Sequence, residues 1–167
     1  MNMLLLKNTW MLFCLMLAIS SIAQQSTFYT SATIGIASPV LDNGVGFHVG
    51  VHPSTTLTDR LSFDSQISYL CTDVKSGFLS GGDFNIHSFN MLGGGRFYFN
   101  SSEKTNRFYI NLLLGGNYNV ESNGVVTIDR NFKLGFSTGA FVKLKRLLLG
   151  ISFDAPQHRV FKVGYQL

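Results

Sequence analysis

The last strand-length stretch of the sequence alternates strictly between apolar and more polar side chains. Its apolar positions are Phe161, Val163, Tyr165 and Leu167. Because successive side chains of a β-strand point to opposite faces, this period of two predicts a strand with one apolar face. A strand that runs to its last residue in this pattern needs a partner strand and apolar surroundings. A closed barrel in a lipid bilayer supplies both, since its last strand pairs with its first.

The same alternation recurs along the chain. It is clearest at residues 44–52, where Val45, Phe47, Val49 and Val51 alternate with glycine and histidine. Three glycines at 93–95 blur the pattern, and we expect them to mark a bend or close packing. In all, we predict eight strands, placed to within a few residues. They cover residues 27–37, 44–52, 60–70, 84–99, 107–118, 131–144, 147–154 and 160–167.

The connections between these strands alternate in length. Residues 53–59, 100–106 and 145–146 form short connections, whereas 38–43, 71–83 and 119–130 are mostly longer. Outer-membrane barrels have short turns in the periplasm and longer loops outside, so an even strand number predicts that both termini are periplasmic. The tight turn at 145–146 also predicts a register. It places Val142 opposite Leu149, Ala140 opposite Ile151, and Gly139 opposite Ser152.

The composition favours a membrane barrel over a soluble domain. Charged residues make up 13% of the chain, against about 25% in typical soluble domains. A small soluble domain has much surface for its volume and needs charge to cover it. No segment after the N-terminal region is long and apolar enough for a transmembrane helix. The formal net charge is +4 without a basic run, so no nucleic-acid partner is expected.

The N-terminal region has the pattern of a secretory signal. Lys7 precedes an apolar run over residues 10–19, and small residues follow up to Ala23. We predict a signal peptide over 1–23 and a single barrel domain over 24–167. The alternatives are a retained anchor and a lipoprotein attached through Cys14. After cleavage Cys71 is the only cysteine, which excludes an intramolecular disulfide. It is either a small apolar residue at a strand end or a reactive thiol.

The polar face of the strands distinguishes a membrane barrel from a soluble, lipocalin-like barrel with an apolar cavity. It carries mostly Gly, Ser, Asn and Gln with few charges, which suits a crowded lumen. Buried charges must be paired there. We predict a lumen polar network of His48, Asp64, Arg96, Lys133, Asp154 and Lys162. The aromatic residues expected to form a girdle near the periplasmic strand ends are Phe28, Phe63, Phe97, Phe99, Phe108 and Tyr165.

Residues 46–69, with Leu57-Thr58-Asp59-Arg60-Leu61-Ser62 in their turn, resemble the small outer-membrane barrels often grouped as a "porin family". So do residues 108–118 and the last strand. The resemblance is to the OmpX/OmpA-like kind of Gram-negative bacteria. It implies an all-β, eight-stranded antiparallel up-and-down transmembrane β-barrel in the outer membrane, and the porin label does not imply a pore at this strand number. It also implies that Phe161, Val163, Tyr165 and Leu167 form the signal read by the barrel-assembly machinery.

The expected role is structural or in surface interactions, as a monomer in contact with outer-membrane lipid. Loop 71–83, which contains Phe78, is the candidate site for a surface ligand. No cofactor is expected, because no phosphate loop is present and no metal-ligand spacing stands out. His48 and His52 share a strand face but lie roughly 13 Å apart along it.

The alternative role is that of a lipid-modifying enzyme, a lipid A acyl-chain hydrolase or transferase. If the turn centres near residues 54–59, His48 and Asp64 become cross-strand neighbours with Ser62 diagonal to His48. These three would supply a base, an orienting acid and a nucleophile. The same arrangement also fits an interior structural pair of His48 and Asp64, and we expect the protein not to be an enzyme.

Overall fold

The computed structural model describes residues 27–40, 43–75, 84–100, 105–122, 127–155 and 158–167. The predicted signal peptide, Cys14 and Phe78 lie outside these ranges. No helix in the described part of the chain is long and apolar enough to cross a membrane.

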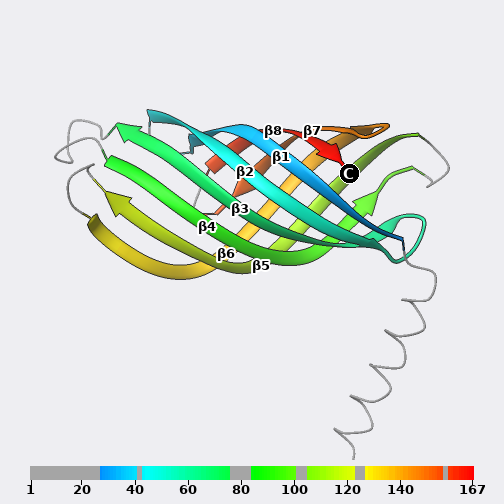
Figure 1. The fold of residues 1–167 in the computed structure, drawn as a ribbon, viewed down its shortest axis with the longest axis horizontal. Coiled ribbons are helices and arrows are strands. Elements are labelled where there is room, and N and C mark those ends of the chain that lie inside the picture. Colours follow the sequence, from blue (N-terminus) through cyan, green and yellow to red (C-terminus); the bar gives the residue numbers. More distant parts are fainter. Residues whose placement is uncertain (1–26, 41–42, 76–83, 101–104, 123–126, 156–157) are drawn as a thin grey trace, which may run out of the picture.

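The described residues form eight antiparallel strands that close into a barrel (Figure 1). Each strand pairs with the next along the chain, and the last also pairs with the first. The strands are β1 (Phe28–Pro39), β2 (Asn43–Thr56), β3 (Leu61–Lys75), β4 (Phe84–Tyr98), β5 (Asn106–Ser122), β6 (Thr127–Leu144), β7 (Leu147–Asp154) and β8 (His158–Gln166). This confirms the predicted all-β, up-and-down barrel.

Closure occurs where the sequence predicted it. Ile34 of β1 lies opposite Val163 of β8, and Gly35 lies opposite Lys162. Beyond β8, the Leu167 N–H donates a hydrogen bond to the Thr30 carbonyl at 2.9 Å. The alternating segment at the end of the sequence is therefore the strand that completes the barrel.

The hairpin of β6 and β7 has the predicted register. Gly139 lies opposite Ser152, and the two flanking apolar pairs also match. The turn is tight because Lys145 adopts a left-handed conformation with φ of 57°, which suits the twist of a two-residue hairpin turn.

Several strands are longer than predicted. β2 continues through Pro53 to Thr56, and β3 continues to Lys75. Residues 71–75 of the predicted loop 71–83 therefore belong to a strand. The prediction ended these strands too early because proline and polar residues interrupt the apolar alternation, although the main chain continues to pair.

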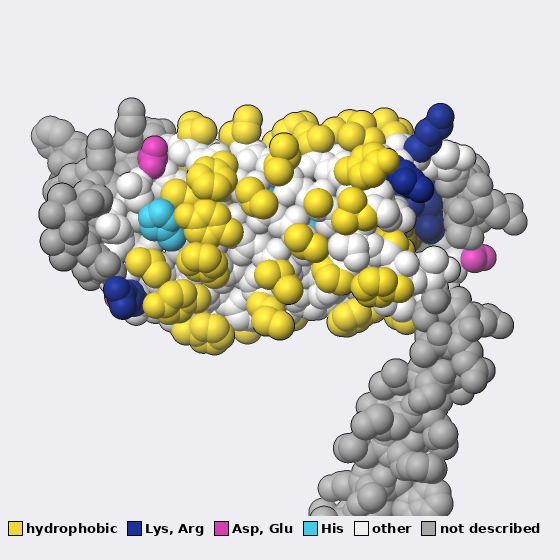
Figure 2. Space-filling view, in the orientation of Figure 1, with side chains coloured by type: hydrophobic (Ala, Val, Ile, Leu, Met, Phe, Trp, Pro, Cys, Tyr) yellow, Lys and Arg dark blue, Asp and Glu magenta, His cyan; other side chains and the backbone are white. Residues whose placement is uncertain are grey.

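The apolar face of every strand points outward. In β5, Phe108, Ile110 and Leu112 are exposed while Tyr109 and Asn111 are buried. On the face shown in Figure 2, hydrophobic side chains are spread over the middle of the barrel, and charged side chains lie towards its two ends. A transmembrane barrel has this surface, whereas a lipocalin-like barrel would be apolar inside. The six predicted girdle aromatics all have outward, exposed side chains.

The glycines at 93–95 occupy both faces of β4. Gly94 points inward, where a Cβ atom would clash with the Leu112 carbonyl oxygen of β5. Gly95 points outward into open space. The prediction of close packing therefore holds at Gly94.

Candidate functional site

The inward face of the barrel is polar and buried. Of the predicted lumen residues, His48, Asp64, Arg96, Asp154 and Lys162 are at most 2% exposed. They form two clusters, which we name after their basic residues: the Arg96 cluster and the Lys162 cluster.

Lys133 corrects the prediction, because its side chain is exposed and joins neither cluster. It lies opposite the buried Asn117. The alternation along β6 therefore puts Lys133 on the same face of the sheet as the lumen residues. However, β7 ends at Asp154, which lies opposite Ser137. Among the described residues, β6 before Phe136 therefore has a strand on only one side, and Lys133 is left open to its surroundings.

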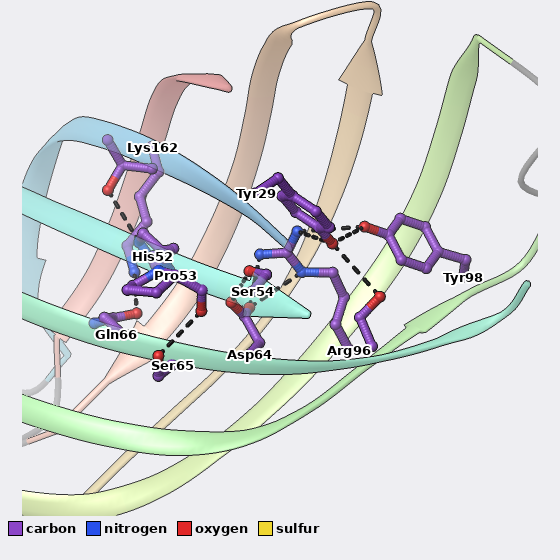
Figure 3. A network of polar contacts seen from close by, with 12 residues as sticks. Tyr29, His52, Pro53, Ser54, Asp64, Ser65, Gln66, Arg96, Tyr98 and Lys162 are labelled. Atoms are coloured by element: carbon purple, nitrogen blue, oxygen red, sulfur yellow. Dashed lines mark hydrogen bonds and ion pairs between the residues drawn. The ribbon is translucent and has the colours of Figure 1, made fainter. Parts of the chain in front are cut away.

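The Arg96 cluster contains a buried ion pair with several hydrogen bonds (Figure 3). Arg96 Nη2 and Nε both donate to Asp64 Oδ2, at 2.7 and 3.1 Å. Ser54 Oγ donates to the other carboxylate oxygen of Asp64 at 2.6 Å. Charge-assisted hydrogen bonds of this kind are stronger than neutral ones.

Tyrosines complete the surroundings of the guanidinium. Arg96 Nη1 donates to the hydroxyls of Tyr29 and Tyr98 at 3.2 and 3.3 Å. These two hydroxyls lie 2.8 Å apart. The guanidinium carbon also lies 4.4 Å from the ring centroid of Tyr109, within range of a cation–π interaction. β1, β3, β4 and β5 are therefore joined through one side chain.

Aromatic rings pack against one another inside the barrel, near the end that carries the short turns. Tyr109 stacks on Phe141 with centroids 5.1 Å apart, and Tyr98 packs on Tyr109 at 5.2 Å. The Arg107 guanidinium lies 3.4 Å from the Tyr98 centroid. Tyr98, Tyr109, Phe141 and Leu148 are all buried and form one apolar cluster.

The Lys162 cluster joins β2, β3, β6, β7 and β8. Lys162 Nζ lies 2.7 Å from Asp154 Oδ2 and donates to Gln66 Oε1 at 3.4 Å. Ser137 Oγ donates to Asp154 Oδ1 at 2.6 Å. Lys162 lies between two glycines, Gly35 on β1 and Gly150 on β7, and so has room to extend into the lumen.

His48 belongs to the Lys162 cluster by position. Its Nε2 lies 3.7 Å from Asp154 Oδ2, beyond hydrogen-bond distance. Neither ring nitrogen has a hydrogen-bond partner among the described residues, although the side chain is fully buried. His48 therefore sits beside the ion pair without a hydrogen bond to it.

The predicted arrangement of His48, Asp64 and Ser62 is wrong. In the β2–β3 register, His48 lies opposite Leu70, Asp64 opposite Ser54, and Ser62 opposite Thr56. The acid nearest His48 is Asp154 on β7 instead. The structure does not bring these three residues together as nucleophile, base and orienting acid.

The sequence prediction missed the serines that bind the two lumen aspartates. Ser54 lies directly opposite Asp64, and Ser137 directly opposite Asp154. Each serine occupies an inward position of its strand, so its face could be predicted from the alternation. The pairing could be found only with the correct register.

A closed barrel with an apolar exterior and buried ion pairs in its lumen is a transmembrane β-barrel. No protein-family model matches the sequence, and no curated protein matches it. Among solved structures, the chain is similar to Neisserial surface protein A at 16% identity. That match covers 85% of this chain and 97% of the other, with a TM-score of 0.54.

Two further solved structures are similar, with lower TM-scores. The outer membrane enzyme PagL is 13% identical over 84% of this chain and 99% of its own, with a TM-score of 0.49. A de novo designed transmembrane β-barrel is 13% identical over 83% of this chain and 95% of its own, with a TM-score of 0.48. The similarity to the Neisserial protein shows the fold: this chain has that of the small eight-stranded outer-membrane β-barrels.

Proposed function

We propose that the chain is an outer-membrane barrel with a lumen filled by side chains, serving a structural or surface-interaction role. One observation carries the proposal: the apolar side chains point outward while the ion pairs of both lumen clusters are buried. Such a barrel suits lipid, because its strands close into one sheet and the ion pairs of both clusters lie away from the acyl chains.

The lumen clusters support a barrel that does not conduct. Arg96 and Lys162 are each paired with an acid at 2.7 Å, at most 2% exposed. The stacked rings around Tyr109 occupy the same interior. Eight strands enclose a space just wide enough for side chains to fill, so we expect no ion current through the reconstituted protein.

The remaining expectations follow from the class of barrel. The short turns and both termini would lie in the periplasm, the last strand would be recognised by the barrel-assembly machinery, and the barrel would be a monomer in lipid. A surface ligand would bind at loop 71–83, of which residues 76–83 lie outside the described residues. We assign no catalytic role to His48, Asp64 or Ser62, because they lie apart.

A substitution on the lipid face tests the location. Val49 is 47% exposed on the outward face of β2. Val49→Asp would place a carboxylate in the acyl chains, at a cost of about 2–3 kcal/mol. We expect the variant to be depleted from the outer-membrane fraction and to lose heat-modifiable gel migration, while Val49→Thr retains both. If Val49→Asp were assembled like the unchanged protein, the outward face would not contact lipid.

A further inference from the structure

Two basic side chains face each other inside the barrel, at the end that carries the short turns. Arg107 is the second residue of β5 and Lys143 is the last but one of β6, and the two lie directly opposite each other. Arg107 is only 8% exposed, and Lys143 is partly buried opposite the inward Leu148 of β7. Both residues, which we call the Arg107 pair, therefore belong to the lumen and not to the lipid-facing exterior.

Two like charges in this arrangement are unfavourable. Side chains directly opposite each other on one face of a sheet have Cβ atoms about 5 Å apart, and like charges at such positions destabilise the sheet. The repulsion is stronger where burial keeps water away. Arg96, the next cation inside the barrel, is balanced by Asp64, with 2.7 Å between Nη2 and Oδ2. The Arg107 pair therefore adds two positive charges to this end of the lumen.

No acid in the described part of the chain forms an ion pair with the Arg107 pair. The ion pairs between described residues are those of the Arg96 and Lys162 clusters. Asp59 contacts Arg107 through its backbone carbonyl, which accepts a hydrogen bond from Nη2 at 2.5 Å. Because a peptide carbonyl has no net charge, this contact does not balance the guanidinium.

The Arg107 guanidinium is held in place with one nitrogen unused. Its carbon lies 3.4 Å from the ring centroid of Tyr98, so one face rests on the ring. Nη2 is fixed by Asp59, whereas the buried Nε has no hydrogen-bond partner among the described residues. A buried donor without a partner is costly. The guanidinium thus keeps a donor available where the charge is unbalanced.

A pair of tyrosines also connects the two cations. Lys143 Nζ lies 5.8 Å from the ring centroid of Tyr29. The hydroxyls of Tyr29 and Tyr98 meet at 2.8 Å (Figure 3). Each cation of the Arg107 pair therefore lies over one of two rings that are hydrogen-bonded to each other. Cation–π contacts of this kind help to hold the two charges in place before a ligand arrives.

We propose that the Arg107 pair binds a small oxyanion with a charge close to −2, of the phosphate or sulfate class. Arg107 Nε and Lys143 Nζ would donate charge-assisted hydrogen bonds to its oxygens. Two cations and one dianion balance, so the ligand would turn a repulsive pair into a favourable one. The proposal goes beyond the proposed structural role. It requires a folded barrel but no particular orientation in the membrane.

The test is isothermal titration calorimetry of the full-length chain, folded in an uncharged detergent. The titrant is sodium phosphate at about pH 8, where phosphate carries a charge close to −2. We expect one phosphate to bind saturably. Arg107→Gln and Lys143→Gln should each weaken binding at least about tenfold, because each removes a charged donor. Arg146→Gln is the matched control, since it removes an exposed cation from the tight turn at the same end. It should bind phosphate like the unchanged chain.

Urea unfolding in the same detergent gives a second readout. A ligand that binds only the folded state stabilises it. Phosphate should therefore raise the urea midpoint of the unchanged chain and of Arg146→Gln, compared with sodium chloride of equal ionic strength. Lys143→Gln should show no such rise. In chloride, Lys143→Gln should be at least as stable as the unchanged chain, because it removes the repulsion.

A further variant tests whether the chain supplies the anion itself. Glu103 lies in the connection between β4 and β5, outside the described residues. Glu103→Gln should leave the affinity for phosphate unchanged. An affinity that rises about tenfold or more would mean that this carboxylate balances the Arg107 pair, and the proposal would be overturned.

Three other results would also overturn the proposal. They are the absence of saturable phosphate binding, an equal loss of binding in Arg146→Gln and Arg107→Gln, and a midpoint that rises as much in chloride as in phosphate. Heat-modifiable migration of each variant shows whether it is folded. A folded barrel that binds no phosphate refutes this inference alone, whereas a chain that is soluble without detergent refutes the proposed function.

Discussion

The Arg96 and Lys162 clusters each bury one ion pair in the lumen, but they surround it differently. The Arg96 guanidinium donates to Asp64 twice and to two tyrosine hydroxyls, and one face lies over a ring. Among the described residues, the polar contacts of Lys162 are with Asp154 and, at 3.4 Å, Gln66. The adjacent His48 has no hydrogen bond to any other residue that the structure describes. Because an unmet buried polar group costs about 1–3 kcal/mol, we infer that the Arg96 cluster contributes more to stability.

The largest effect is expected from Arg96→Met. It removes the cation and leaves the Asp64 carboxylate buried, with Ser54 as its remaining side-chain donor in the described part of the chain. We expect the free energy of unfolding to fall by about 3–5 kcal/mol, measured by urea unfolding in lipid vesicles with heat-modifiable migration as the readout. The exposed Arg159→Met serves as the control and should change stability by less than about 1 kcal/mol. Equal effects would mean that the Arg96 cluster contributes nothing specific.

A smaller loss is expected from Lys162→Met. The Asp154 carboxylate keeps its hydrogen bond from Ser137, and the methionine fills much of the volume of the lysine stem. We expect a loss of about 2 kcal/mol in the same unfolding assay. A loss larger than that of Arg96→Met would reverse the order of the two clusters.

The smallest effect is expected from His48→Leu. The leucine keeps much of the buried volume and removes two ring nitrogens that lack partners. Stability should change by less than about 1 kcal/mol in either direction. Destabilisation above about 2 kcal/mol would show that the imidazole makes an interaction on which the lumen depends.

The sequence was sufficient to predict the fold class, because alternation is a local property. β7 has the predicted bounds, Leu147–Asp154, since a two-residue turn and an uninterrupted apolar pattern define it. The predicted faces are also observed: Val49 is outward, whereas Asp64 and Lys162 are inward.

The sequence was not sufficient to predict which lumen residues meet. The predicted strand ends before Pro53, and a turn centred near residues 54–59 places Asp64 opposite His48. In the structure the strand continues through Pro53, and Asp64 lies opposite Ser54. The actual contacts of His48 and Lys162 with Asp154 also depend on barrel closure and stagger. These are properties of all eight strands together, and no local pattern reports them. Lys133 shows the same limit, because its exposure depends on where β7 ends.

The most direct test of the difference between the clusters is a pair of double-mutant cycles. One combines Arg96→Met with Asp64→Leu, and the other combines Lys162→Met with Asp154→Leu, with free energies of unfolding measured in the same vesicles. Each cycle isolates the interaction between the two side chains from the cost of each replacement. We predict a coupling energy for Arg96 and Asp64 that exceeds the other by at least about 1 kcal/mol. Equal coupling energies, or a larger one for Lys162 and Asp154, would contradict the account.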